Sequence, residues 1–121
     1  KSNMQLININ QLPAFGPDTF VAHLKGQEMR TLRSFYPRIA KAFLFSEYFG
    51  KNLDALFDCL CNFENLPLDY KHVVLVVHNA PEFLSKEKPE KREAVLQIML
   101  DAAISDNRYD EYTFEVFWVK L

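Results

Sequence analysis

The sequence predicts an α/β fold in which a three-stranded parallel sheet packs against helices. Three segments have the composition of strands, and segments with helical spacing lie between them. Parallel strands need long crossover connections, which are usually helices, so this alternation favours a parallel sheet. The chain has 121 residues, of which 49% are hydrophobic and 25% charged, as is typical of one globular domain.

Residues 1–17 are predicted to form an N-terminal extension, followed by a domain at residues 18–121. Residues 1–3 stand before Met4 and are interpreted as the remnant of an expression tag, with the native start at Met4. Two prolines and a glycine interrupt the rest of the extension. Its LINI stretch can therefore form a short edge strand at most.

The first strand and helix of the domain are expected between residues 19 and 44. The segment TFVAHL has strand character and ends at a Lys-Gly pair. Ser34 is expected to cap the helix that follows, which runs to about Leu44. Pro37 then takes the third helical position, where its missing amide costs no intrahelical hydrogen bond. The core face of this helix is formed or bordered by Leu32, Phe35, Ile39, Ala42 and Phe43.

A second helix is expected at about residues 53–63, with Asn52 as its N-cap. At about 100° per residue its apolar residues share one face, whereas Asp54 and Asp58 lie together on the flank away from that face. Phe57 falls at the border, where an aromatic ring can be partly exposed beside charge. The apolar face consists of Leu53, Leu56, Leu60 and Phe63.

The two aspartates of this helix differ in their surroundings. Asp54 lies in the first turn, where the helix dipole favours a negative charge, but Asp58 lies one turn further on and repels it. Tyr48 precedes the helix, and aromatic side chains beside acids suit an anchored interface. The pattern therefore predicts a docking surface for a partner. An ordinary solvated acid is the alternative interpretation of Asp58.

The remaining elements complete the alternation of strands and helices. The β-branched run HVVLVVH, residues 72–78, predicts a strand that is covered on both faces and central in the sheet. A short helical turn is expected at residues 81–84, and a solvated loop around SKEKPEKRE. A helix is expected at about residues 89–104, and YTFEVFWVKL alternates as a final strand. In that helix Val95, Met99, Ala102 and Ala103 point inward, and Gln97, Asp101 and Ser105 align on another face.

Composition and the spacing of the cysteines indicate the cellular compartment in which we expect the protein. No apolar run approaches the roughly 20 residues of a membrane span, and the start lacks the apolar region of a signal peptide. Cys59 and Cys61 lack the spacing of a metal site and are awkwardly placed for an unstrained mutual disulfide. Free thiols fit a reducing compartment, so we expect a cytoplasmic protein. We expect no membrane partner, metal or cofactor.

The net charge of −2 hides a segregation of charge along the chain. Five acids and one lysine lie between Glu47 and Asp69, whereas five basic residues and one acid lie between Phe20 and Phe45. The acidic part coincides with the predicted docking helix. An acidic surface is complementary to a basic surface on a partner.

Three stretches resemble the barstar family of ribonuclease inhibitors and immunity proteins. The most specific is EYFGKNLDALFDCL, which has the family's aromatic pair, Gly, capping Asn, Leu-Asp-Ala-Leu, an aromatic residue and Asp-Cys-Leu. EAVLQIMLDA is similar to the family's last helix, and HLKGQEMRTL is similar to the region of its first strand. The resemblance runs from about Phe20 to Leu121 and implies a barstar-like fold in a bacterial, cytoplasmic protein.

The resemblance implies that the chain is not an enzyme but an inhibitor of a ribonuclease toxin. In this family the helix and the loop before it plug the active site of the nuclease, and a carboxylate takes the place of a substrate phosphate. Asp58 matches that carboxylate, and Asp101 falls where the last helix has a glutamate facing the enzyme. The positions that match the other contacts are Tyr48, Gly50, Asn52, Asp54 and Phe57.

The chain also departs from the family pattern. Phe57 replaces a tryptophan, and Asp101 is shorter than the family's acid. Ser105 stands where a second acid is expected, and Asp106 is its neighbour. These differences favour a ribonuclease that is related to barnase but different from it. The family lacks the residues before about Asp18, so the extension inherits no role.

Three other functions remain open. An acid–base or metal enzyme would combine the two helical aspartates with His72 or His78, although histidines on an apolar strand are more often structural. A regulator of the same fold could bind a protein other than a nuclease through the same acidic helix. A nucleic-acid-binding protein would use a basic cluster, but a pI near 5.9 argues against a general polyanion binder. The basic cluster consists of Arg30, Arg33, Arg38 and Lys41.

Overall fold

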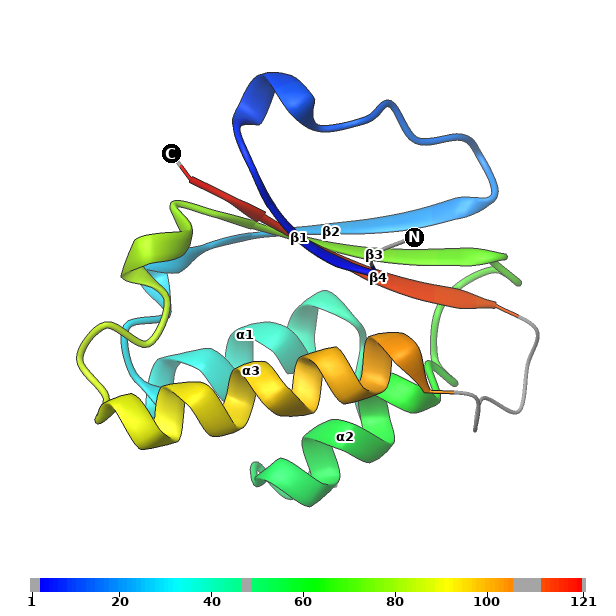
Figure 1. Cartoon of the computed structure of the whole chain (residues 1–121). Helices are drawn as coiled ribbons and strands as arrows, with labels where there is room; N and C mark the ends of the chain where they lie inside the picture. The colour runs from blue at the N-terminus through cyan, green and yellow to red at the C-terminus, as the bar shows by residue number, and fades with distance from the viewer. Residues whose placement is uncertain (1–2, 47–48, 106–111, 121) are drawn as a thin grey trace.

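The protein is described by a computed structural model, which covers residues 3–46, 49–105 and 112–120. A four-stranded sheet forms its centre, and three helices lie on one face of that sheet (Figure 1). The strands are β1 (Met4–Ile7), β2 (Thr19–Lys25), β3 (His72–His78) and β4 (Thr113–Val119). The α-helices are α1 (Leu32–Ala42), α2 (Leu53–Cys61) and α3 (Pro89–Ile104), and the 3-10 helices are η1 (Ile9–Gln11), η2 (Gly26–Glu28) and η3 (Ala80–Glu82).

The strands run in the order β1-β4-β3-β2, and each neighbouring pair is parallel. The α/β class and the parallel sheet are therefore confirmed, and β3 is central as its β-branched sequence predicted. The predicted number of three strands is wrong, because Met4–Ile7 pairs with β4 as a fourth strand. This strand lies at the edge of the sheet, where the LINI stretch was expected if it formed a strand at all.

The two faces of the sheet are covered by different parts of the chain. On one face the odd-numbered residues of β3 are buried against the helices. The other face is covered by residues 8–18, of which Leu12 and Phe15 pack against the strands (Figure 1). The residues buried on that face are Ile7, Val74, Val76, Phe117 and Val119.

The predicted N-cap of α1 is wrong. Thr31 caps the helix, and its Oγ1 accepts a hydrogen bond from the amide of Ser34 at 3.2 Å. The Ser34 hydroxyl accepts in turn from the amide of Thr31 at 3.3 Å, which completes a capping box. Since the helix begins at Leu32, Pro37 is its sixth residue. The helix therefore lacks the hydrogen bond that an amide at this position would donate to Arg33.

The C-terminus of α1 is a Schellman motif without glycine. Leu44 has a left-handed backbone, with φ of 57°, and its amide donates to the carbonyl of Lys41 at 3.4 Å. The amide of Phe45 donates to the carbonyl of Ala40 at 2.9 Å. These two bonds satisfy carbonyls that the helix itself leaves free. The helix ends at Ala42, earlier than the predicted end near Leu44.

The predicted core faces of α1 and α3 are confirmed. α3 has its predicted bounds, whereas α2 ends at Cys61 and not at Phe63. In the described parts of the chain, no helix combines the length and the apolar character that crossing a membrane requires. The predicted core residues that are buried are Phe35, Ile39, Phe43, Val95, Met99, Ala102 and Ala103, and Leu32 and Ala42 are partly buried against them.

Candidate docking surface

Helix α2 begins at an asparagine cap, as predicted. Asn52 has an extended backbone, with φ of −142° and ψ of 172°, and its Oδ1 accepts a hydrogen bond from the amide of Ala55 at 2.9 Å. Its Nδ2 donates to the carbonyl of Gly50 at 3.2 Å. A single side chain thus connects the loop before the helix to the first helical turn.

Gly50 gives this cap the space that it occupies. A Cβ atom on Gly50 would lie 3.0 Å from the Nδ2 of Asn52 and 3.5 Å from the Cβ of Ala55. The left-handed residue of the loop is the neighbouring Lys51, with φ of 52°. This conformation costs a residue other than glycine about 1 kcal/mol or more. The loop therefore turns at Lys51, and Gly50 leaves room for the cap.

Aromatic packing anchors the same loop to the body of the protein. Phe49 is half-buried, and its ring meets those of Tyr36 and Phe45 edge-on, with centroids 5.8 Å and 5.2 Å away. The sequence prediction gave Phe49 no role, although its place in an aromatic pair before a glycine was a signal. Tyr48, which was predicted to contact a partner, lies outside the described residues, as does Asp106.

The faces of α2 separate apolar from acidic side chains. Leu56 and Leu60 are fully buried, and Phe57 is half-buried against the core. Asp54 and Asp58 are exposed, and neither forms an ion pair or a side-chain hydrogen bond with a described residue. Both carboxylates are therefore available to a partner. We call Gly50, Asn52, Asp54, Phe57 and Asp58 the docking surface, after the role that the sequence analysis predicts for them.

Asp101 lies on a helix that packs against α2 (Figure 1). It belongs to the last turn of α3 and is partly exposed. Gln97, one turn earlier, donates from Nε2 to Asp101 Oδ1 at 2.8 Å. This bond agrees with the predicted alignment of the two residues and orients the carboxylate. Ser105 is the C-cap of α3.

Helix α2 carries Cys59 and Cys61 near its C-terminal end. Cys61 is buried and Cys59 is half-buried. Burial raises the pKa of the Cys59 thiol, and the negative charges of Asp58 and Glu64 raise this pKa further. Because the thiolate is the reactive form, a raised pKa makes Cys59 a poor nucleophile at neutral pH. Both residues act as small apolar side chains of the helix.

The histidines of β3 are separated from the aspartates of α2. Side chains alternate along a strand, so His72 and His78 share the face of Val74 and Val76, away from the helices. His72 Nδ1 forms a hydrogen bond with Thr113 Oγ1 at 2.8 Å. The fold therefore does not assemble the acid–base site of the enzyme alternative. In the described part of the chain, no three His, Cys, Asp or Glu residues are grouped to hold a metal.

His78 forms a separate pair with His23 on β2. His23 Nδ1 and His78 Nε2 are 2.9 Å apart, a distance at which one ring donates its proton to the other. Burial lowers the pKa of His78, and the nearby His23 and Lys25 lower this pKa further. His78 is therefore neutral at pH 7, and the pair is a hydrogen bond between neighbouring strands.

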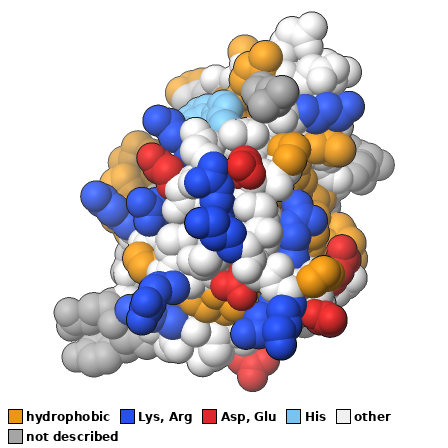
Figure 2. Space-filling model, turned by 90° about the vertical axis from the view of Figure 1, so that its left-hand side faces the viewer, with side chains coloured by type: hydrophobic (Ala, Val, Ile, Leu, Met, Phe, Trp, Pro, Cys, Tyr) orange, Lys and Arg blue, Asp and Glu red, His pale blue; other side chains and the backbone are white. Residues whose placement is uncertain are grey.

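The basic cluster of the nucleic-acid alternative is partly neutralised. Figure 2 shows the side of the molecule where β2, β3 and β4 end, and acidic side chains lie among its Lys and Arg side chains. Arg30 Nη2 is 3.1 Å from the carboxylate of Glu82, and Arg38 Nε is 3.7 Å from that of Glu28. A mixed surface of this kind does not form a continuous basic track for a nucleic acid.

One family model matches most of the chain. It is described as Barstar (barnase inhibitor), and it matches residues 19–121. The match includes α1 to α3 and β2 to β4, and it contains the docking surface and Asp101. Strand β1 and the layer formed by residues 8–18 lie before it.

Proposed function

The chain belongs to the barstar family, and we propose that it inhibits a ribonuclease toxin by placing the docking surface of α2 in the active site. The family is described as barnase inhibitors, which are binding proteins and not enzymes. The observation that carries the proposal is the pair of exposed carboxylates on α2. Neither Asp54 nor Asp58 is neutralised by a described residue.

In this proposal Asp58 takes the place of an RNA phosphate. Ribonucleases bind phosphates with clustered Lys, Arg and His side chains, to which a carboxylate presents a similar negative charge. Charge-assisted hydrogen bonds from arginine to a carboxylate are about twice as strong as neutral ones. Leu56 and Leu60 fix the inner side of the helix, so little conformational freedom is lost when Asp58 binds.

The other residues of the proposed interface surround this acid. Phe57 presents part of an aromatic ring beside the charges, and Asn52 and Gly50 present the loop. Tyr48 and Asp101 complete the proposed contact set. Because Phe57 and Asp101 depart from the family pattern, we propose a ribonuclease related to barnase but different from it. We propose further that residues 18–121 form the inhibitory domain and that the protein acts in the bacterial cytoplasm.

The direct test is to recover the partner from the source cell with the wild-type chain as bait. We expect a small basic ribonuclease whose hydrolysis of RNA stops when the purified chain is added. Asp58→Ala should weaken this binding by roughly 2 to 5 kcal/mol, because the cations of the enzyme are left buried without a partner. That loss corresponds to a roughly 30-fold to several-thousand-fold higher Kd.

Glu115→Ala is the matched control for this variant. Glu115 lies on β4 and faces the side of the sheet opposite the helices, so its loss should leave binding unchanged. Circular dichroism checks that both variants are folded. Equal inhibition by wild type and Asp58→Ala would exclude Asp58 as the phosphate mimic. A partner without nuclease activity would exclude the whole proposal.

A further inference from the structure

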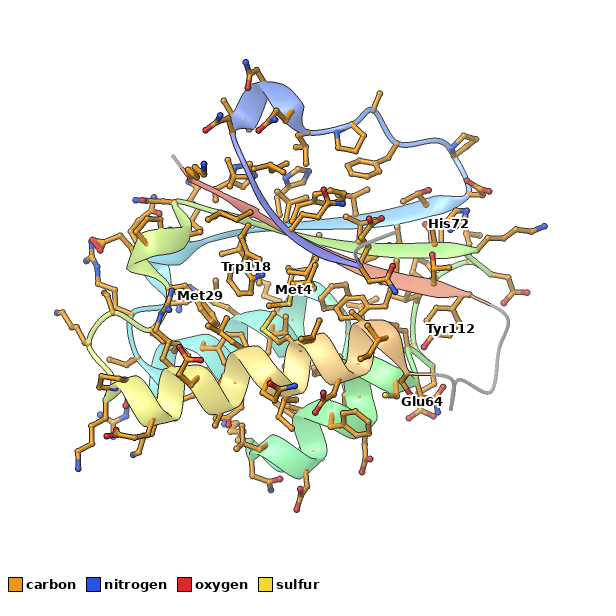
Figure 3. All side chains as sticks on the ribbon, viewed as in Figure 1. Met4, Met29, Glu64, His72, Tyr112 and Trp118 are labelled. Atoms are coloured by element: carbon orange, nitrogen blue, oxygen red, sulfur yellow. The ribbon has the colours of Figure 1, made fainter. Side chains whose placement is uncertain are left out.

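A groove with apolar walls lies between the edge strand β1 and α3, apart from the docking surface. Its volume is about 340 Å³. Figure 3 shows that two of its residues, Met4 and Trp118, lie on the side of the sheet that faces the helices. Leu6, at the mouth of the groove, is 61% exposed. The apolar walls are formed by Met4, Leu6, Ala80, Pro81, Leu96 and Trp118.

Two cations border these apolar walls. Arg92 and Lys120 line the groove, and neither forms an ion pair with a residue that the structure describes. Arg92 Nε donates to the carbonyl of Phe83 at 2.8 Å, which holds the guanidinium in place and leaves its terminal nitrogens available. The groove thus combines an apolar interior with two positive charges that no described residue pairs with.

Trp118 forms part of the apolar wall. Its side chain is 94% buried, since only 6% is exposed, and it packs on Phe83 with ring centroids 5.0 Å apart. The indole Nε1 is buried and has no acceptor among the described residues. An unpaired buried donor is unfavourable. The same burial keeps this nitrogen from contact with a ligand at the groove surface, so Trp118 offers the groove its apolar ring.

Size and charge together select the kind of occupant. Small-molecule sites span about 300 to 1,000 Å³, and this groove lies near the lower limit. A second copy docked through a two-fold axis would place the groove against itself and bring its cations close to their own copies. A small ligand with an apolar body and a negative head fits the volume of the groove, and its charge attracts the two cations. We propose that the groove binds a small aliphatic carboxylate, whose chain lies against Leu6 and Leu96 and whose head group faces Arg92 and Lys120.

Trp118 makes the test direct because it is the only tryptophan of the chain. Its fluorescence should change and saturate as octanoate is added to the full chain. The uncharged 1-octanol should bind at least about fivefold more weakly, because it lacks the charge that the two cations attract. Acetate, which has the charge without the apolar chain, should cause no saturable change.

Variants assign the binding to the groove. Arg92→Gln and Lys120→Gln should each raise the Kd of octanoate about fivefold and leave that of 1-octanol unchanged. Lys86→Gln removes an exposed lysine that does not line the groove, and it should change neither value. Leu6→Thr should weaken both ligands. Leu68→Thr, at a leucine that is 66% exposed elsewhere, is its control.

Several results would overturn the proposal. Equal affinities for octanoate and 1-octanol would show that the groove does not recognise the charge. An emission change that depends on protein concentration, together with a dimer in analytical ultracentrifugation, would show that a second copy occupies the groove. Displacement of octanoate by a short acidic peptide that binds more tightly would identify a peptide as the occupant. The absence of any saturable signal would show that no such ligand binds.

Discussion

At the scale of single residues, Asn52 links the stability of α2 to the position of the docking surface. Its Oδ1 satisfies an amide of the first turn, and its Nδ2 holds the carbonyl of Gly50. Asp54 and Asp58 follow on the helix that this side chain starts. A change at Asn52 should therefore affect folding and binding together, although Asn52 carries no charge.

We expect Asn52→Ala to lower the free energy of unfolding by about 1 kcal/mol, because the first turn loses its capping acceptor. The measurement is urea unfolding followed by circular dichroism. Asn52→Asp keeps an acceptor at the same position and should retain most of the stability. If alanine and aspartate variants are equally stable, the side chain does not cap the helix in solution.

In the proposed function, Asp58 serves binding at a cost to the stability of the helix. It lies one turn from Asp54, and like charges at this spacing destabilise a helix by a few tenths of a kcal/mol. Asp58→Ala should therefore be at least as stable as the wild type while it loses affinity for the nuclease. A lower affinity without a lower stability would show that the variant has lost a contact with the partner and has kept its fold.

At the scale of elements, the predictability of the fold depended on how local each signal was. The bounds of α3 and the position of β3 follow from continuous patterns of apolar residues, and both were predicted. The cap at Asn52 was predicted because an asparagine stands directly before the apolar spacing. In α1 the cap was predicted at Ser34, but Thr31, three residues earlier, caps the helix and Ser34 completes its capping box.

Two features of the fold lacked a clear signal in the local sequence. Strand β1 is only four residues long, and it pairs with β4, more than 100 residues away along the chain. The end of α1 uses Leu44 where glycine is usual, so its composition carried no stop signal. In α2 and the loop before it, the cap and the outward position of the acids were predicted, but the turn at Lys51 and the packing of Phe49 were not.

The layer formed by residues 8–18 should contribute to the stability of the fold. Phe15 is half-buried, and its ring lies 6.0 Å from that of Phe117, centroid to centroid. Phe15→Ala should lower the free energy of unfolding by about 1 to 3 kcal/mol, because apolar surface on the sheet becomes exposed. Urea unfolding measures this loss. Asn10→Ala, at an exposed position of the same segment, should have little effect.

Binding should distinguish this layer from the docking surface. Residues 8–18 cover the face of the sheet opposite the helices, so Phe15→Ala should keep its affinity for the nuclease while it remains folded. Unchanged stability of Phe15→Ala would mean that the layer does not pack on the sheet in solution.

At the scale of the whole molecule, the fold separates surfaces with different properties. The helices and the docking surface lie on one side of the sheet, and the N-terminal layer lies on the other. The net charge is only −2, so the acidic character of α2 is local and not a property of the entire protein. A local charge attracts a basic partner in one orientation, which a uniform charge does not do.

This arrangement predicts how salt affects association with the nuclease. The association rate constant should fall about tenfold or more as ionic strength rises from about 0.02 M to 0.5 M, because salt screens the attraction between exposed charges before contact. The dissociation rate should change less, since charges that are buried in the complex are screened less. Stopped-flow fluorescence measures both rates.

Asp54→Asn should reduce the salt dependence of the association rate, whereas Glu115→Gln, on the opposite face, should not. Association that is insensitive to salt in the wild type would show that the charge of α2 does not guide the encounter, whatever the affinity of the final complex.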